Sequence, residues 1–142
     1  MQLSIRKMTP ADFDAVYQLW QGLAGVGLSE SDNPQAITRF LNRNPGLSFL
    51  ALDSDSLVGA VLCGHDGRRG YIHHLAVSQG HRRQGIGRQL VDHCLAALRN
   101  QGIGKCHIFV FRENQGAIAF WEGMNWSKRE ELNIMSMFVS KE

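Results

Sequence analysis

The chain has 142 residues, of which 44% are hydrophobic and 20% are charged, and its formal net charge is +2. This length and composition are typical of a single globular domain, which we expect to span residues 1–142. So small a net charge argues against a nucleic-acid-binding protein. The sequence contains no run of roughly 18 apolar residues and no apolar leader, so neither a membrane span nor an exported protein is predicted.

The three cysteines favour a reducing compartment. Cys63, Cys94 and Cys106 are odd in number, form no C-x-x-C pair and lie among apolar neighbours. Free thiols of this kind are typical of cytoplasmic proteins. The expected location is therefore the cytoplasm.

The first third of the chain predicts one strand and two helices. Leu3 and Ile5 alternate with polar residues, as in a short strand. Thr9, followed by Pro10 and Asp12, has the pattern of a helix start. That helix ends in the glycine-spaced stretch 22–27, and a second helix begins at Asn33-Pro34 and ends before 44–46.

The remainder predicts a hairpin, a third strand, and then alternating helices and strands. Two apolar runs, 47–52 and 57–63, flank a turn-rich tetrapeptide, and 71–77 is a further strand. The later elements are a helix closed by Gly102, a central strand, a helix and a final strand, at residues 90–102, 105–111, 114–123 and 132–139. The order predicts an α/β (α+β mixed) fold, with a mixed sheet covered by helices.

The segment Arg82-Arg83-Gln84-Gly85-Ile86-Gly87 joins a strand to a helix. It lacks the lysine and hydroxyl of a Walker loop, and Leu90 stands where the dinucleotide fingerprint needs a third glycine. Glycines nevertheless allow close backbone approach, and amides at a helix start favour an anion. The pattern is that of a pyrophosphate cradle, although a glycine pair of this kind on its own is more typical of a tight turn.

Two motifs together resemble a known family. Leu75-Ala76-Val77 followed by 82–87 is similar to motif A, R/Q-x-x-G-x-G/A, of the GNAT superfamily of N-acetyltransferases. Asn114, Ala117 and Phe120-Trp121, ending at Asn125-Trp126, resemble the family's later motif. The resemblance to bacterial single-domain members implies an acyl-CoA N-acyltransferase fold. Such a fold has about six to seven strands splayed between strands 4 and 5, and about four helices.

The resemblance implies acetyl-CoA as the cosubstrate and no metal. The pyrophosphate would lie on the amides from Gln84 to Arg88, Ile86 among them, with Arg82, Arg83 and Arg88 facing phosphates or solvent. The pantetheine arm would pair with the backbone near Leu75 and Val77. Further positions matching the cofactor side are Ala76, Asn114, Ala117 and Phe120.

Acetyl transfer to an amine requires a base and an oxyanion donor. An alkylamine with a pKa of about 10 is protonated at neutral pH, so a group must remove its proton. Strand alternation places His73 and His74 on opposite faces unless a bulge intervenes. His73 is the candidate base; His74, a bound water, or a merely packed His73 are the alternatives. The backbone amide of Leu75 is the expected oxyanion donor.

Trp121 departs from the family pattern. Many members have a tyrosine there that protonates the departing thiolate, whereas an indole cannot act as an acid near neutral pH. A thiol with a pKa of about 8.5 still leaves reasonably well as a thiolate. Trp121 is therefore interpreted as a wall of the acyl-CoA cleft.

The expected function is N-acetylation of a primary amine by direct attack on acetyl-CoA in a ternary complex. Three kinds of acceptor amine fit this expectation equally: that of a small molecule, of a peptide N-terminus or of a lysine side chain. Glu30 and Asp32, in the loop between the first helices, are two acids that would either attract a cation or simply be solvated at the surface. The alternative is a catalytically weak CoA-sensing regulatory or interaction protein of the same fold, and the resemblance also allows a homodimer.

Overall fold

The computed structural model of the protein describes residues 1–140. The chain forms two compact units, Met1–Phe109 and Val110–Glu142. The first unit contains the sheet and the segments that carry most of the predicted site. The second contains one helix and the chain that follows it.

The first unit is built on one mixed sheet. In chain order its strands are β1 (Leu3–Lys7), β2 (Phe49–Asp53), β3 (Ser56–His65), β4 (Gly70–Val77) and β5 (Cys106–Ile108). They are also neighbours in this order, with antiparallel pairing up to β4 and parallel pairing of β4 with β5. The predicted hairpin and third strand are confirmed.

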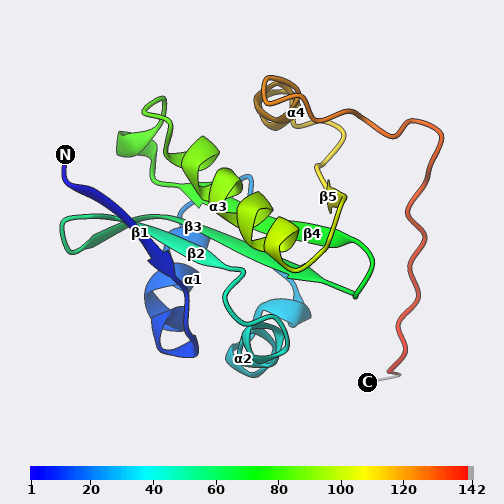
Figure 1. The fold of residues 1–142 in the computed structure, drawn as a ribbon, viewed down its shortest axis with the longest axis horizontal. Helices are drawn as coiled ribbons and strands as arrows, with labels where there is room; N and C mark the ends of the chain where they lie inside the picture. Colours follow the sequence, from blue (N-terminus) through cyan, green and yellow to red (C-terminus); the bar gives the residue numbers. More distant parts are fainter. Residues whose placement is uncertain (141–142) are drawn as a thin grey trace. The chain divides into compact units, whose positions relative to one another are not determined.

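Helices cover both faces of this sheet. Helices α1 (Phe13–Gln21) and α2 (Pro34–Arg43) lie across one face, and α3 (Ile86–Asn100) lies across the other (Figure 1). Capping interactions confirm the predicted starts of α1 and α2. A short 3-10 turn (Pro10–Asp12) precedes α1 and carries the Thr9 capping box, and the Asn33 side chain accepts a hydrogen bond from Ala36 N at the start of α2.

The core has a layer on each side of the sheet. Trp20 of α1 and Leu41 of α2 pack with Leu62 of β3 on one side. On the other side, α3 approaches the sheet closely because glycines face it. A Cβ on Gly59 would lie 3.1 Å from Leu90 Cδ1, and one on Gly70 would lie 2.6 Å from Leu98 Cδ1.

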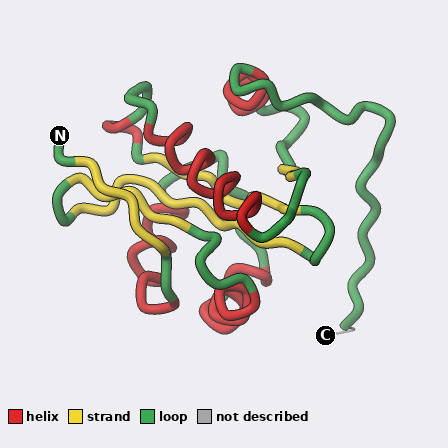
Figure 2. Tube along the Cα trace, viewed as in Figure 1, coloured by secondary structure: helices red, strands yellow, loops and turns green. Residues whose placement is uncertain are grey.

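The second unit contains helix α4 (Gln115–Glu122). The Asn114 side chain caps it by accepting a hydrogen bond from Ala117 N at 3.0 Å. Within this unit the Trp121 ring packs against Trp126, with ring centroids 4.7 Å apart. From residue 126 to residue 140 the chain is drawn as loop (Figure 2).

The predicted strand count is wrong. Among residues 1–140 the sheet has five strands rather than six to seven. The strand expected at 105–111 extends only over Cys106–Ile108, where its pairing with β4 stops, and the strand expected at 132–139 is absent from the described chain. Apolar composition alone favours a strand, but a strand forms only where a partner satisfies its backbone groups. The apolar side chains of this last segment are 58–100% exposed.

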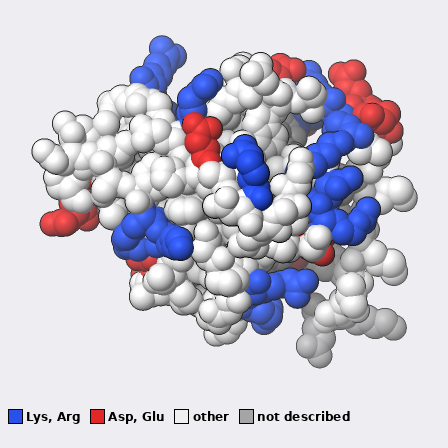
Figure 3. Space-filling view, in the orientation of Figure 1, with Lys and Arg blue, Asp and Glu red and all other residues white. Residues whose placement is uncertain are grey.

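The surface carries charges of both signs. Basic and acidic side chains are both visible among a majority of uncharged residues (Figure 3). Within residues 1–140, no helix is long and apolar enough to cross a membrane.

Candidate active site

The sheet opens between β4 and β5. In the described chain their parallel ladder joins three pairs, Gly70 with Cys106, Tyr71 with His107 and Ile72 with Ile108. Strand β4 continues to Val77, so its second half runs on past the last pair. Backbone groups on that side of β4 are therefore available to an extended ligand.

A bulge interrupts β4 where it leaves β5. Leu62 faces His73 and Ala60 faces Ala76, so one residue of β3, Val61, stands opposite two residues of β4. These two residues are His74, which has a left-handed φ of 50°, and Leu75. Because a bulge removes residues from the ladder and re-aims their side chains, Leu75 is well placed to offer its amide to a ligand.

The bulge places His73 and His74 on the same face of the sheet, which overturns the expectation that they face opposite ways. His73 lies edge-on to Phe40 of α2, with ring centroids 5.9 Å apart. His74 lies edge-on to Trp20 of α1, with centroids 4.9 Å apart. The face covered by α1 and α2 therefore carries both histidines.

His74 is held by a buried carboxylate. Its Nε2 lies 2.8 Å from Asp32 Oδ1, and Asp32 Oδ2 accepts a hydrogen bond from Ser29 N at 2.9 Å. Asp32 is only 5% exposed. Since a carboxylate only accepts hydrogen bonds, Nε2 must carry a proton, and in the neutral ring Nδ1 is then the lone-pair nitrogen. The pair also connects the loop between α1 and α2 to the bulge.

Sequence reasoning missed this pair. It named Asp32 only as an acid that would attract a cation, together with Glu30. Glu30 is exposed, whereas Asp32 is already engaged by His74. The available signal was Ser29-x-x-Asp32, a capping-box pattern in which Asp32, the last residue of a 3-10 turn (Glu30–Asp32), directs its carboxylate back to the amide of Ser29.

His73 has the protonation behaviour that a base requires. Burial lowers the pKa of its imidazole, the neighbouring His74 lowers it further, and Asp32 opposes the shift. A lowered pKa keeps His73 neutral at neutral pH, with a ring nitrogen able to accept a proton.

The glycine loop leads into the start of α3. Gly85 occupies the N-cap position with φ 79°, and Arg83 also has a left-handed φ, of 64°. Helix α3 begins at Ile86, and Gln89 N donates to Gly85 O, so the amides of Ile86 and Gly87 lie in the first helical turn, whose N–H groups point toward the loop. A Cβ on Gly85 would meet no atom within 4 Å, so the space beside the loop is open. These features suit a bound anion.

A second histidine that is held by an aspartate, His81, lies just before this loop. His81 Nδ1 lies 2.8 Å from Ser78 Oγ, and its Nε2 lies 3.2 Å from Asp53 Oδ2. Ser78 N also donates to Val58 O at 2.8 Å. The contacts of His81 are those of a structural anchor between the loop and the β2–β3 turn.

The later motif lies in the second unit. Asn114 is the cap of α4, Ala117 is half-buried and Phe120 is 38% exposed. Trp121 is 6% exposed. Asn125, near the end of the motif, has φ 71°, a left-handed conformation that asparagine tolerates better than most residues.

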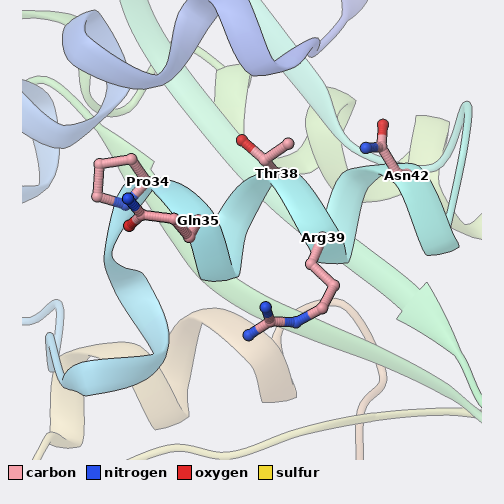
Figure 4. Close-up of a pocket in the computed structure, with 5 residues that line it drawn as sticks. All are labelled: Pro34, Gln35, Thr38, Arg39 and Asn42. Atoms are coloured by element: carbon pink, nitrogen blue, oxygen red, sulfur yellow. The ribbon is translucent and has the colours of Figure 1, made fainter.

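Other features of the described residues do not form a comparable site. Residues 1–140 contain no group of three or more histidine, cysteine or acidic side chains placed to hold a metal. A hollow of about 490 Å³ lies over α2, lined by Pro34, Gln35, Thr38, Arg39 and Asn42 (Figure 4). All five residues come from this one helix, and none belongs to β4 or to the glycine loop.

A sheet that opens beside a bulged strand, followed by a glycine loop at a helix start, is the arrangement expected of an acyltransferase. The chain belongs to the Acetyltransferase (GNAT) family, whose profile matches residues 13–126. The family resemblance drawn from the two motifs is thus confirmed, and the protein is an acetyltransferase.

Known proteins support this assignment. An acetyltransferase of Pectobacterium atrosepticum is 31% identical over 124 residues, which cover 87% of each chain. N-alpha-acetyltransferase 30 of Schizosaccharomyces pombe is 32% identical over 110 residues, or 74% of this chain and 73% of that one. The PaiA N-acetyltransferase of Thermoplasma acidophilum, solved with coenzyme A, shares the fold with a TM-score of 0.75 at 18% identity, covering 87% and 89% of the two chains.

Proposed function

We propose that the protein transfers the acetyl group of acetyl-CoA to a primary amine by direct attack in a ternary complex. The observation that carries this proposal is the bulge of β4. It lies beside the gap toward β5, presents a neutral histidine on the α1–α2 face, and precedes a glycine loop at the start of α3. A donor site and an acceptor site would thus meet at one strand.

The described residues fit the cosubstrate. Backbone amides from Gln84 to Arg88 would hold its pyrophosphate, where the open space beside Gly85 admits a large anion. Arg82 and Arg83 are exposed at the rim of the loop, where they would add charge-assisted bonds. Beyond the last β4–β5 pair, the backbone near Leu75, Ala76 and Val77 would pair with the pantetheine arm.

In the proposed reaction His73 removes one proton from the ammonium group of the acceptor. The amine nitrogen then forms a bond to the acetyl carbon, while the thioester C–S bond breaks and the sulfur leaves with the bonding electrons. The Leu75 amide donates a hydrogen bond to the carbonyl oxygen as negative charge develops on it. After the attack the nitrogen gives its remaining excess proton to water, and the departing thiolate takes a proton from water, so the amide and the free thiol form without an acid at Trp121.

Acetyl-CoA binding provides the first test. Gly85→Glu places a carboxylate at the cradle and strains a left-handed position, so we expect acetyl-CoA affinity in calorimetry to fall by at least about 100-fold. Gly104→Glu is the matched control, because a Cβ there also meets no atom within 4 Å and the site is far along the chain from the loop. Equal affinity of the two variants would exclude this cradle.

Turnover provides the second test, in an acetyl-CoA-dependent thiol-release assay over a panel of amines. His73→Gln should lower kcat by about 100-fold or more if His73 is the base. Acetyl-CoA affinity should stay unchanged, because the His73 side chain faces α2 rather than α3. A His73→Gln enzyme with unaltered kcat would reassign the proton transfer to His74 or to a bound water.

Trp121 supports a second candidate function, a CoA-sensing regulatory protein with little turnover. It stands where family members have the acid that protonates the thiolate. Acetyl-CoA binding without thiol release from any amine would favour this sensor. Robust turnover would exclude it.

We also propose that residues 1–142 act as one catalytic domain in the cytoplasm. The family profile extends over both compact units, from residue 13 to residue 126. Cys63, Cys94 and Cys106 are free, and burial raises the pKa of the Cys106 thiol to about 12. A thiol with so high a pKa is unreactive, and free cysteines suit a reducing compartment.

A further inference from the structure

Five ring side chains gather where β4 and β5 separate. Tyr71 and His73 come from β4, His107 from β5, Phe109 directly follows β5, and Phe40 comes from α2. Tyr71 is central to this ring cluster. Its ring centroid lies 5.6 Å from that of His107, 6.1 Å from that of Phe109 and 6.5 Å from that of His73.

The rings are arranged as a platform with one open end. The planes of Tyr71 and His73 differ by 11°, and those of Tyr71 and Phe109 by 24°, so these rings are stacked. Phe109 is 59% exposed, whereas the other four rings are half-buried. A flat apolar group from solvent can therefore continue the stack on Phe109.

The ring cluster includes the proposed base. His73 lies 6.4 Å from Phe109 and 5.9 Å from Phe40, measured between ring centroids. A group bound on Phe109 would thus carry an amine on a short arm to within reach of His73. The faces of Phe109 and Tyr71 would also attract the ammonium form before it loses its proton.

The charges around the platform do not suit a polycation. Residues 70–77 and 106–109 contain no aspartate or glutamate. Asp32, the acid that reaches this face through His74, is 5% exposed and is already bonded to His74 and Ser29. Several ammonium groups of one substrate would find no carboxylate partner on these strands, and their dehydration would go uncompensated.

We propose that the acceptor is a primary amine attached by a short arm to an aromatic or large apolar group, which stacks on the exposed ring of Phe109. This inference rests on the proposed acetyltransferase function and specifies its substrate class. A free arylalkylamine and a peptide with an aromatic first residue share the chemistry, and the test separates these two sources.

The test compares kcat/KM for matched amines in the thiol-release assay. 2-Phenylethylamine and a tetrapeptide beginning with Phe represent the proposed class, and spermidine and the same peptide beginning with Ser are the comparators. Stacking and apolar contact on one exposed ring should change kcat/KM about 10-fold. We therefore expect at least about a 10-fold higher kcat/KM for the aromatic member of each pair. Whichever aromatic member has the higher kcat/KM identifies the source.

Variants of Phe109 connect the preference to the ring cluster. Phe109→Ala should abolish the preference, and Phe109→Leu should retain part of it, because leucine keeps apolar contact without stacking. Phe138→Ala is the control, since Phe138 is also exposed, at 79%, and lies outside the ring cluster. A preference for spermidine, or an aromatic preference that persists in Phe109→Ala, would overturn the proposal.

Binding measurements separate failure of this inference from failure of the proposed function. Calorimetry with 2-phenylethylamine should detect binding to the CoA complex of the protein, and Phe109→Ala should weaken it about 10-fold. If 2-phenylethylamine binds in a way that depends on Phe109 but no amine is turned over, the ring cluster is a binding site and the proposed acetyl transfer is refuted. If amines are turned over but spermidine is preferred, the proposed acetyl transfer stands and the aromatic acceptor class is refuted.

Discussion

The bond between Asp32 and His74 is the polar contact that ties the loop between α1 and α2 to the bulge of β4. Asp32→Ala removes two interactions, the 2.8 Å bond to His74 and the 2.9 Å cap on Ser29 N. A hydrogen bond to a charged group contributes about 1.5–3 kcal/mol, and a lost cap costs about 1 kcal/mol. Because the Asp32 and His74 side chains are only 7% and 18% exposed, solvent replaces these bonds poorly.

We therefore expect Asp32→Ala to lower the free energy of unfolding by about 3 kcal/mol, or Tm by about 10 °C. Asp32→Asn should cost less, because its amide oxygen can still cap Ser29 N. Urea unfolding followed by tryptophan fluorescence and by circular dichroism measures both changes. The tryptophan signal reports locally, since Trp20 lies against His74.

A double-mutant cycle isolates the pair itself. Asp32→Asn, His74→Gln and the double variant should give a coupling energy of about 1–2 kcal/mol. Since we propose that the loop held by this pair borders the acceptor site, Asp32→Asn should also raise KM for the amine while leaving acetyl-CoA affinity unchanged. A coupling energy near zero, or equal changes in both substrates, would refute the positioning role.

Three further expectations follow from backbone geometry and burial. Gly64→Ala should cost about 1–3 kcal/mol in urea unfolding, because its Cβ would lie 2.7 Å from Asn44 Nδ2. Gly104→Ala, with open space, is its control, and equal stability of the two would contradict the packing argument. Gly85→Ala, at φ 79°, should cost about 1 kcal/mol and weaken acetyl-CoA binding; unchanged unfolding would show that the loop relaxes. Because burial lowers the pKa of His73, the unfolded chain takes up this proton first on acidification, so stability should fall as pH drops below about 6.5. His73→Gln should lose less stability than the wild type between pH 7 and pH 5. In the wild type, kcat/KM corrected for ionisation of the amine should fall on the acid side with an apparent pKa below 6.5. An apparent pKa above 6.5 would indicate that another group is the base.

Local signals in the sequence determined the segments that we propose hold the acetyl donor. Capping residues and prolines marked where α1 and α2 begin, because a helix start requires side-chain acceptors within a few residues. The glycine loop before α3 was equally predictable from the sequence, because a left-handed φ such as that of Gly85 depends on the residue type at one position. Together with the later motif, these signals were sufficient to indicate the family.

The acceptor half was decided by tertiary structure. Strand alternation predicted opposite faces for His73 and His74, and the bulge at His74 overturned this, because a register shift depends on pairing with β3. Asp32 lies 42 positions from the histidine that it holds. The ring cluster likewise joins Phe40 to Phe109 through two strands.

The two halves differ for one physical reason. A phosphate cradle is made of consecutive amides and the start of a helix, so neighbouring residues suffice to specify it. The acceptor side is made of side chains from separate elements, and their distances are set by strand register, by the bulge and by the close packing of α2 on Gly64. The sequence alone therefore indicated how the acetyl donor would be held, and only the folded chain brought together the groups that would select and deprotonate the amine.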